Sequence, residues 1–192
     1  MDDGTDALVA MKVAAILDGG GDNIYNLVLQ EVTGPRRMVM TIGVSEAQAI
    51  AVFMEGIAMP RPMTHDLMAR IVGSLGGRLS RVIIEGLDQG RFLTQMVFEH
   101  DGLPIVLDAR TSDAVALAIR CQAPIFARES VVELAGAGFP PPARQPRQKT
   151  IADIATQELR QKLDEAVQTE DYETAQRIQE ELRRRGDASA TR

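Results

Sequence analysis

Cysteine, tryptophan and long apolar runs are scarce in this chain of 192 residues, and each absence narrows what the protein can be. The single cysteine, Cys121, excludes an intrachain disulfide, which fits a reducing compartment. Tryptophan is absent and aromatic residues make up only 4%, so aliphatic side chains and the nine methionines must fill the core. The best apolar stretch, residues 47–59, is interrupted by Glu55, so we expect no membrane span.

An excess of positive charge is also lacking. Residues 1–139 carry 11 Lys and Arg against 17 Asp and Glu, and residues 140–192 carry 10 of each kind. Positive charge supplies most of a protein's non-specific affinity for nucleic acid. To bind nucleic acid, this chain would therefore need a divalent metal or a local basic groove. The acidic start MDDGTDALVA has no positive n-region of a secretory signal. We therefore expect a soluble, cytoplasmic protein.

Apolar runs and turn residues predict an α+β domain. Ser45 with Gln48 forms a capping-box pattern at a helix start, and Thr64 opens a second helix. The apolar residues of that second helix predict a buried face made of Leu67, Met68, Ile71, Val72 and Leu75. Strands are predicted at 9–17, 24–32, 37–42, 79–87, 91–99 and 104–109, with a third helix at 112–121 and a short extended piece at 124–126.

The chain contains an internal repeat. A shift of 67 positions carries Ser45-Glu46-Ala47 onto Ser112-Asp113-Ala114, and the strands before each helix follow with nearly the same offset. We infer a duplicated β-β-β-α unit, with both copies sharing one mixed sheet and one core. The alternative is chance similarity between two short capped helices.

A change of composition marks a second unit. Residues 136–149 are rich in Pro and Gly and predict a semi-rigid linker between a domain at 1–135 and a helical hairpin at 150–187. Each hairpin helix has one narrow apolar stripe, so we expect it to pair with another protein or another copy of the chain. The expected docking residues are Leu159, Leu163, Tyr172, Ala175, Ile178 and Leu182.

Two polar clusters carry potential chemistry. His65 and Asp66 lie at a helix start, where the imidazole would be a general base or a metal ligand, or where Thr64 and Asp66 would simply stabilise the helix end. Asp108, Arg110 and Asp113 lie at a strand-to-helix junction, which favours anion binding. Ser112-Asp113 recurs in the repeat as Ser45-Glu46, which predicts a helix cap used twice, so any special role is expected of Asp108 and Arg110 more than of Asp113.

Residues 9–135 resemble the bifunctional nuclease (BFN) domain family. The resemblance is carried by Arg61-Pro62, by Thr64-His-Asp-Leu67, by the segment Asp108 to Arg120 and by Ala123-Pro-Ile125. It implies an α+β fold and a bacterial nuclease that acts on both DNA and RNA.

Residues 157–185 resemble the UVR motif of excision-repair proteins. The matching positions include Leu159, Leu163, Glu170-Asp-Tyr-Glu173, Ala175 and Ile178. This resemblance implies a protein-docking hairpin and a role in DNA repair.

The leading hypothesis is a metal-assisted nuclease that cleaves phosphodiester bonds. His65 or Asp66 would orient water, Asp108 with Asp113 would hold Mg²⁺ or Mn²⁺, and Arg110 would steady the scissile phosphate. Arg61 and Arg120 are further candidates for binding substrate, and a homo-oligomer is expected. The alternative is a non-catalytic adaptor or ligand-binding protein in DNA repair or stress response.

Overall fold

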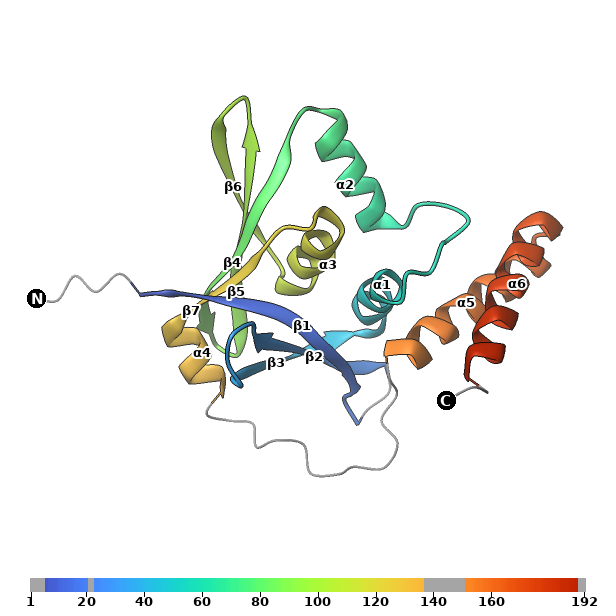
Figure 1. Cartoon of the computed structure of the whole chain (residues 1–192), viewed down its shortest axis with the longest axis horizontal. Coiled ribbons are helices and arrows are strands. Elements are labelled where there is room, and N and C mark those ends of the chain that lie inside the picture. The colour runs from blue at the N-terminus through green and yellow to red at the C-terminus, as the bar shows by residue number, and fades with distance from the viewer. Residues whose placement is uncertain (1–5, 21–22, 137–150, 190–192) are drawn as a thin grey trace, which may run out of the picture.

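The protein folds around one seven-stranded mixed sheet (Figure 1). The computed structural model describes residues 6–20, 23–136 and 151–189. The predicted α+β class, with a mixed sheet and a C-terminal helical pair, is confirmed within these residues. The strands are β1 (Leu8–Asp18), β2 (Ile24–Glu31), β3 (Arg37–Gly43), β4 (Arg78–Asp88), β5 (Arg91–His100), β6 (Leu103–Ala109) and β7 (Ile125–Arg128). The helices are α1 (Val44–Met54), α2 (Thr64–Ser74), α3 (Thr111–Cys121), α4 (Glu129–Gly136), α5 (Ile151–Gln168) and α6 (Tyr172–Ser189).

The order of strands across the sheet reflects the repeat. The order is β3-β2-β1-β7-β4-β5-β6, so two antiparallel three-stranded units flank the short strand β7. The strand β7 runs antiparallel to β1 and parallel to β4. The shift of 67 residues carries the whole of α1 onto α3, and β1 and β4 have the same length. The element order therefore agrees with a duplicated β-β-β-α unit.

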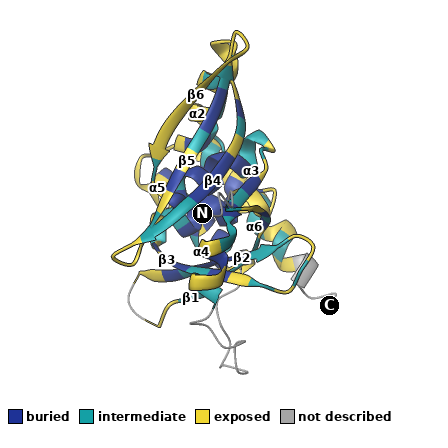
Figure 2. Ribbon diagram, turned by 90° about the vertical axis from the view of Figure 1, so that its left-hand side faces the viewer, coloured by how far each residue is buried: buried dark blue, intermediate teal, exposed yellow. Residues whose placement is uncertain are grey.

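The core is aliphatic and lies between the sheet and the pair α1 and α3, as Figure 2 shows in dark blue. Its largest fully buried side chains are Ile, Leu and Met residues of the strands and helices, which the scarcity of aromatic residues required. The helix α4, which sequence patterning did not predict, packs against β3, β4 and β7. Only eight residues long, it is too short to show a helical period.

Three details differ from the sequence predictions. The helix α1 is capped by Gly43 without a side-chain hydrogen bond, so Ser45 and Gln48 do not form a capping box. The helix α2 is capped by Met63 instead of Thr64. The predicted buried face of α2 is wrong, because Leu67, Met68, Ile71 and Leu75 are exposed and the helix turns His65 inward instead.

The C-terminal hairpin packs on the chain's own first helix. The helix α5 contacts α1, and the Gln48 side chain donates a hydrogen bond of 3.1 Å to that of Gln161. Ile154, Leu159 and Ile178 are fully buried in the same core cluster as the sheet residues. Of the six residues predicted to dock a partner, only Tyr172 is exposed; the other five are buried or partly buried.

The predicted linker lies almost entirely outside the described residues, apart from Gly136 at the end of α4. None of the helices in the described part of the chain combines the length and the apolar composition that a membrane crossing needs.

Leu159→Ala should reveal how strongly the hairpin is attached to the domain. Removing a fully buried leucine side chain leaves a cavity and should lower the free energy of unfolding by about 2–5 kcal/mol. Val167→Ala on the exposed side of the same helix is the matched control and should cost less than about 0.5 kcal/mol. Urea unfolding measured by circular dichroism compares them; equal effects would show that α5 is not docked in solution.

Candidate functional site

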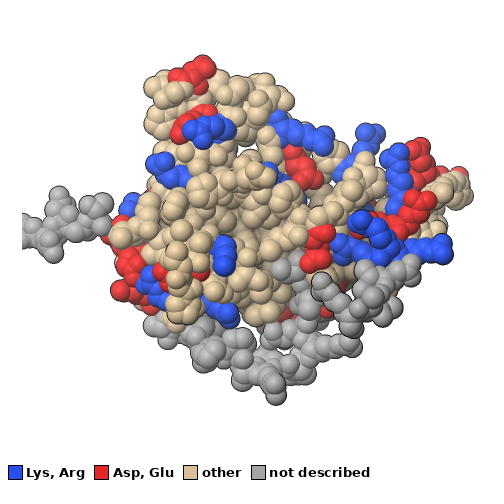
Figure 3. All heavy atoms as spheres, in the orientation of Figure 1, with Lys and Arg blue, Asp and Glu red and all other residues tan. Residues whose placement is uncertain are grey.

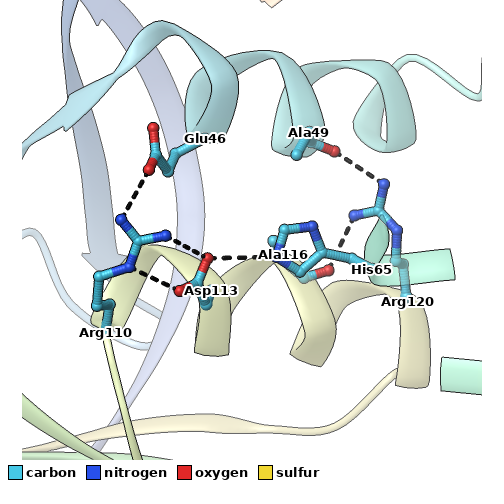
Figure 4. A network of polar contacts seen from close by, with 7 residues as sticks. All are labelled: Glu46, Ala49, His65, Arg110, Asp113, Ala116 and Arg120. Atoms are coloured by element: carbon cyan, nitrogen blue, oxygen red, sulfur yellow. Dashed lines mark hydrogen bonds and ion pairs between the residues drawn. The ribbon is translucent and has the colours of Figure 1, made fainter. Parts of the chain in front are cut away.

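The N-termini of α1 and α3 lie side by side and share one arginine (Figure 4). Arg110, the N-cap of α3, donates two hydrogen bonds to Asp113, from Nε at 2.8 Å and from Nη2 at 3.1 Å. Its Nη1 donates a third, of 2.9 Å, to Glu46 on α1. The hydrogen bonds to Asp113, together with the nearby Asp113 and Glu46 charges, raise the pKa of Arg110. The guanidinium thus bridges the two copies of the repeat.

Arg110 still has donors to offer. A guanidinium carries five N–H groups, and three are used by Asp113 and Glu46, which leaves two without a partner among the described residues. Its side chain is 68% exposed, so these two groups face solvent. An arginine held rigidly by carboxylates on one side and open on the other is suited to receive a phosphate oxygen.

His65 approaches the same carboxylate from the other side. Its Nε2 lies 3.4 Å from Oδ1 of Asp113, and the residue is buried at the start of α2. Asp113 therefore contacts an imidazole and an exposed guanidinium at once. The predicted cap role of Asp113 is wrong, because α3 has no side-chain hydrogen bond at its N-cap and both Asp113 oxygens face Arg110 or His65.

Asp66 and Arg120 are used to hold helices together. Arg120 donates from Nε to Asp66 at 2.5 Å and to the carbonyl oxygens of Ala116 and Ala49 at 2.9 Å each, so it links α3, α2 and α1. Its guanidinium also lies 5.0 Å from the centre of the Phe53 ring, and its side chain is only 3% exposed. A group so enclosed is closed to substrate, and the proposed substrate-binding role of Arg120 finds no support in this geometry.

The pKa of the Asp66 carboxyl reflects these contacts. Burial raises the pKa of Asp66, but hydrogen bonds from Arg120 and from the Met63 N–H, at 2.9 Å, outweigh burial and hold it below its usual value. Asp66 also stabilises the start of α2 through that backbone contact. Both oxygens of this carboxylate thus accept hydrogen bonds that hold the fold together, Oδ1 from Arg120 and Oδ2 from the Met63 N–H.

Asp108 lies away from the others. It pairs with Gln95 across β5 and β6, whereas its neighbour Ala109 pairs with Thr94, which is buried and hydrogen-bonded to Thr111 of α3. Because successive side chains alternate between faces, Asp108 points to the sheet face opposite α3. The pair Asp108 and Asp113 does not fit one metal ion, and no three His, Cys, Asp or Glu side chains gather for one in the described ranges. The divalent ion stays a prediction, and no chemical step is routed through it.

Arg61 lines a cavity between the hairpin and the loop that precedes His65. The cavity measures about 490 Å³ and is bounded by the loop residues 59–64 and by side chains of α5 and α6, including Glu158 and Lys162. Burial raises the pKa of Glu158, whose carboxyl faces this space. Figure 3 shows basic and acidic side chains interspersed over α5 and α6, so the face is not a uniformly basic groove.

Sequence reasoning missed Glu46 as a site residue. The repeat carried the signal, because Glu46 aligns with Asp113 and both carboxylates bind Arg110. The burial of Arg120 could not be predicted from the sequence, because a charged residue at a helix end is ordinarily solvated.

Asp66→Asn tests the structural assignment of this carboxylate. It leaves a buried guanidinium short of its anionic partner, which should lower the free energy of unfolding at pH 7 by about 1–3 kcal/mol. A lowered pKa means that the stabilisation is present above about pH 4 and is lost as the pH falls further. The gap between wild type and variant should therefore narrow from pH 5 to pH 3 in urea unfolding. Asp88→Asn, at the exposed end of β4, is the control; a gap that does not change with pH would contradict the assignment.

Comparison with known proteins places the chain in a family. The sequence model of the bifunctional nuclease domain matches residues 27–139. Two Mycobacterium tuberculosis proteins, "Uncharacterized protein MT1877" of strain CDC 1551 and "Uncharacterized protein Rv1829" of strain H37Rv, are each 34% identical over 146 residues, covering 76% of this chain and 87% of the relative. The match spans α1, α2 and α3, which carry the Arg110, Asp113 and His65 cluster. The chain therefore belongs to the bifunctional nuclease domain family.

Proposed function

We propose that this protein is a nuclease that cleaves phosphodiester bonds in DNA and RNA at the junction of α1, α2 and α3. The observation that carries the proposal is that one carboxylate, Asp113, positions both a histidine and an exposed arginine. Family membership supports the same class of reaction.

The roles follow from the contacts. Arg110 binds a phosphate oxygen with the N–H groups that Asp113 and Glu46 leave unused, and its rigid placement lowers the cost of ordering it. His65 moves a proton to or from the attacking or leaving oxygen, and Asp113 fixes the ring and faces the charge that forms on it. Glu46 and Asp113 hold Arg110 in place and do not react.

A cleavage assay with matched variants tests this assignment. His65→Gln should lower kcat/KM on fluorescent single-stranded DNA and RNA by roughly 10²-fold or more, the loss typical of a proton-transfer group. Arg110→Lys should lower it by about tenfold or more, because lysine lacks the planar fork. Arg78→Lys is the control, since Arg78 is also exposed and paired with a glutamate but lies at the start of β4.

The assay includes arms with Mg²⁺, Mn²⁺ and EDTA, which test the predicted divalent ion separately. Retention of full activity by both site variants, or absence of cleavage by the wild type in every arm, would sink the nuclease proposal. Equal unfolding curves for all variants ensure that a loss of rate is not a loss of fold.

Asp108→Asn gives a separate test of the predicted metal pair. Asp108 points to the opposite sheet face from α3, so cleavage should stay within about twofold of wild type. A collapse of Mn²⁺-dependent cleavage with an unchanged melting temperature would instead restore Asp108 as a metal ligand. Asp101→Asn, in the exposed turn before β6, serves as the control.

A second candidate function, protein docking by the hairpin, rests on its outward groove. The groove measures about 510 Å³ and is lined by Leu163, Val167 and Tyr172 among others, with Val167 and Tyr172 largely exposed. A groove between two helices that exposes apolar side chains is a common seat for a partner's amphipathic helix. The inward stripe attaches the hairpin to α1, which leaves this outward groove for a partner.

A further inference from the structure

The helix α2 presents its apolar side to solvent. Leu67, Met68, Ile71 and Leu75 are 44–71% exposed, and they recur at the spacing of one helical face. His65 is the one buried residue of this helix. A helix whose apolar face is left uncovered is unusual in a monomer, where large exposed apolar patches are rare.

The strand β6 is uncovered in the same way. Leu103, Ile105, Val106 and Leu107 are 45–68% exposed. Because Ile105 and Val106 point to opposite faces, neither face of the strand is covered. Figures 1 and 2 both place β6 and α2 at the same end of the molecule, and Figure 2 shows β6 in the exposed colour.

The strand β6 also ends the sheet. It is the last strand in the order and pairs with β5 alone, so its outer edge carries unpaired backbone groups. Its sequence, LPIVLDA, has no lysine and no bulge that would protect an edge; only Pro104 interrupts it. The opposite edge, β3, differs, because Met38, Met40 and Ile42 are buried there.

We propose that two copies of the chain form a symmetric dimer through the β6 edge and the apolar face of α2. An edge strand that meets its own copy across a two-fold axis is self-complementary, and antiparallel pairing of two β6 strands would join the sheets. Each copy carries a net charge of −6, so two copies repel each other in general. The eight apolar residues add no charge to that repulsion at the proposed interface.

The area agrees with a dimer. A half-exposed leucine or isoleucine leaves on the order of 50 Å² of apolar surface, so eight such residues leave about 400 Å². A standard interface buries about 800 Å² from each partner, of which about two thirds is apolar in homodimers. Because Val106 points to the opposite face from Leu103, Ile105 and Leu107, the interface covers at most seven of these side chains, or about 350 Å². They supply the larger part of the apolar area that a stable dimer needs, and the edge supplies the backbone hydrogen bonds.

The mass of the full chain in solution tests the proposal. Light scattering on a sizing column should give about twice the 20.9 kDa chain mass for the wild type at micromolar concentration. Ile105→Lys on β6 and Ile71→Lys on α2 should each raise the dissociation constant by roughly tenfold or more. Leu134→Lys on α4 is the control, because Leu134 is 62% exposed but lies outside the proposed interface, and it should leave the dimer unchanged.

A wild type with the mass of one chain throughout the range, or a dimer that resists both interface variants, would overturn the proposal. A dimer that dissociates with Tyr172→Lys but not with Ile105→Lys would place the contact at the hairpin and equally overturn it. Hydrogen exchange of the wild type gives a test that does not depend on whether the lysine variants fold. The amides of β6 should be protected in concentrated samples and exchange faster on dilution; exchange independent of concentration would count against the dimer.

Discussion

The helices α1 and α3 pack against each other, both carry fully buried alanines, and the candidate site depends on their close approach. Ala47, Ala51, Ala114 and Ala118 are fully buried, and small side chains allow two helices to pack at short distance. The two N-termini then lie near enough for one guanidinium, that of Arg110, to reach carboxylates on both helices. A larger residue at these positions would separate the two halves of the cluster.

Arg120 completes the same framework at the other end of α3. Its guanidinium reaches the carboxylate of α2 and a carbonyl oxygen of α1, so the start of α2 is held against α3 and His65 is turned inward. Burying a charge is costly unless each donor has a partner, and here Asp66, two carbonyl oxygens and the Phe53 ring provide partners. The cluster of Asp113 with His65 and Arg110 is therefore positioned by residues that do not belong to it.

The apolar surface of the hairpin is covered within the chain, whereas that at the free end of the sheet is not. The hairpin covers α1 with its inward stripe, so residues that resembled a docking face are used inside the chain. The faces of β6 and α2 have no such cover among the described residues. The difference is one of connectivity, because a hairpin at the end of the chain can fold back, whereas the sheet edge needs a separate strand.

Local patterns in the sequence determined the elements, the repeat and the hairpin. Turn residues and apolar runs depend on neighbours a few positions apart, so the strands, the longer helices and the shift of 67 residues were readable directly, whereas the short helix α4 and the helix caps were not. Which face each residue presents was decided by tertiary structure. The pairing of β5 with β6 turned Asp108 away from α3, and helix packing buried Arg120 and exposed Ile71. Such facts depend on contacts between residues distant in the chain, and side-chain periodicity within one element does not contain them.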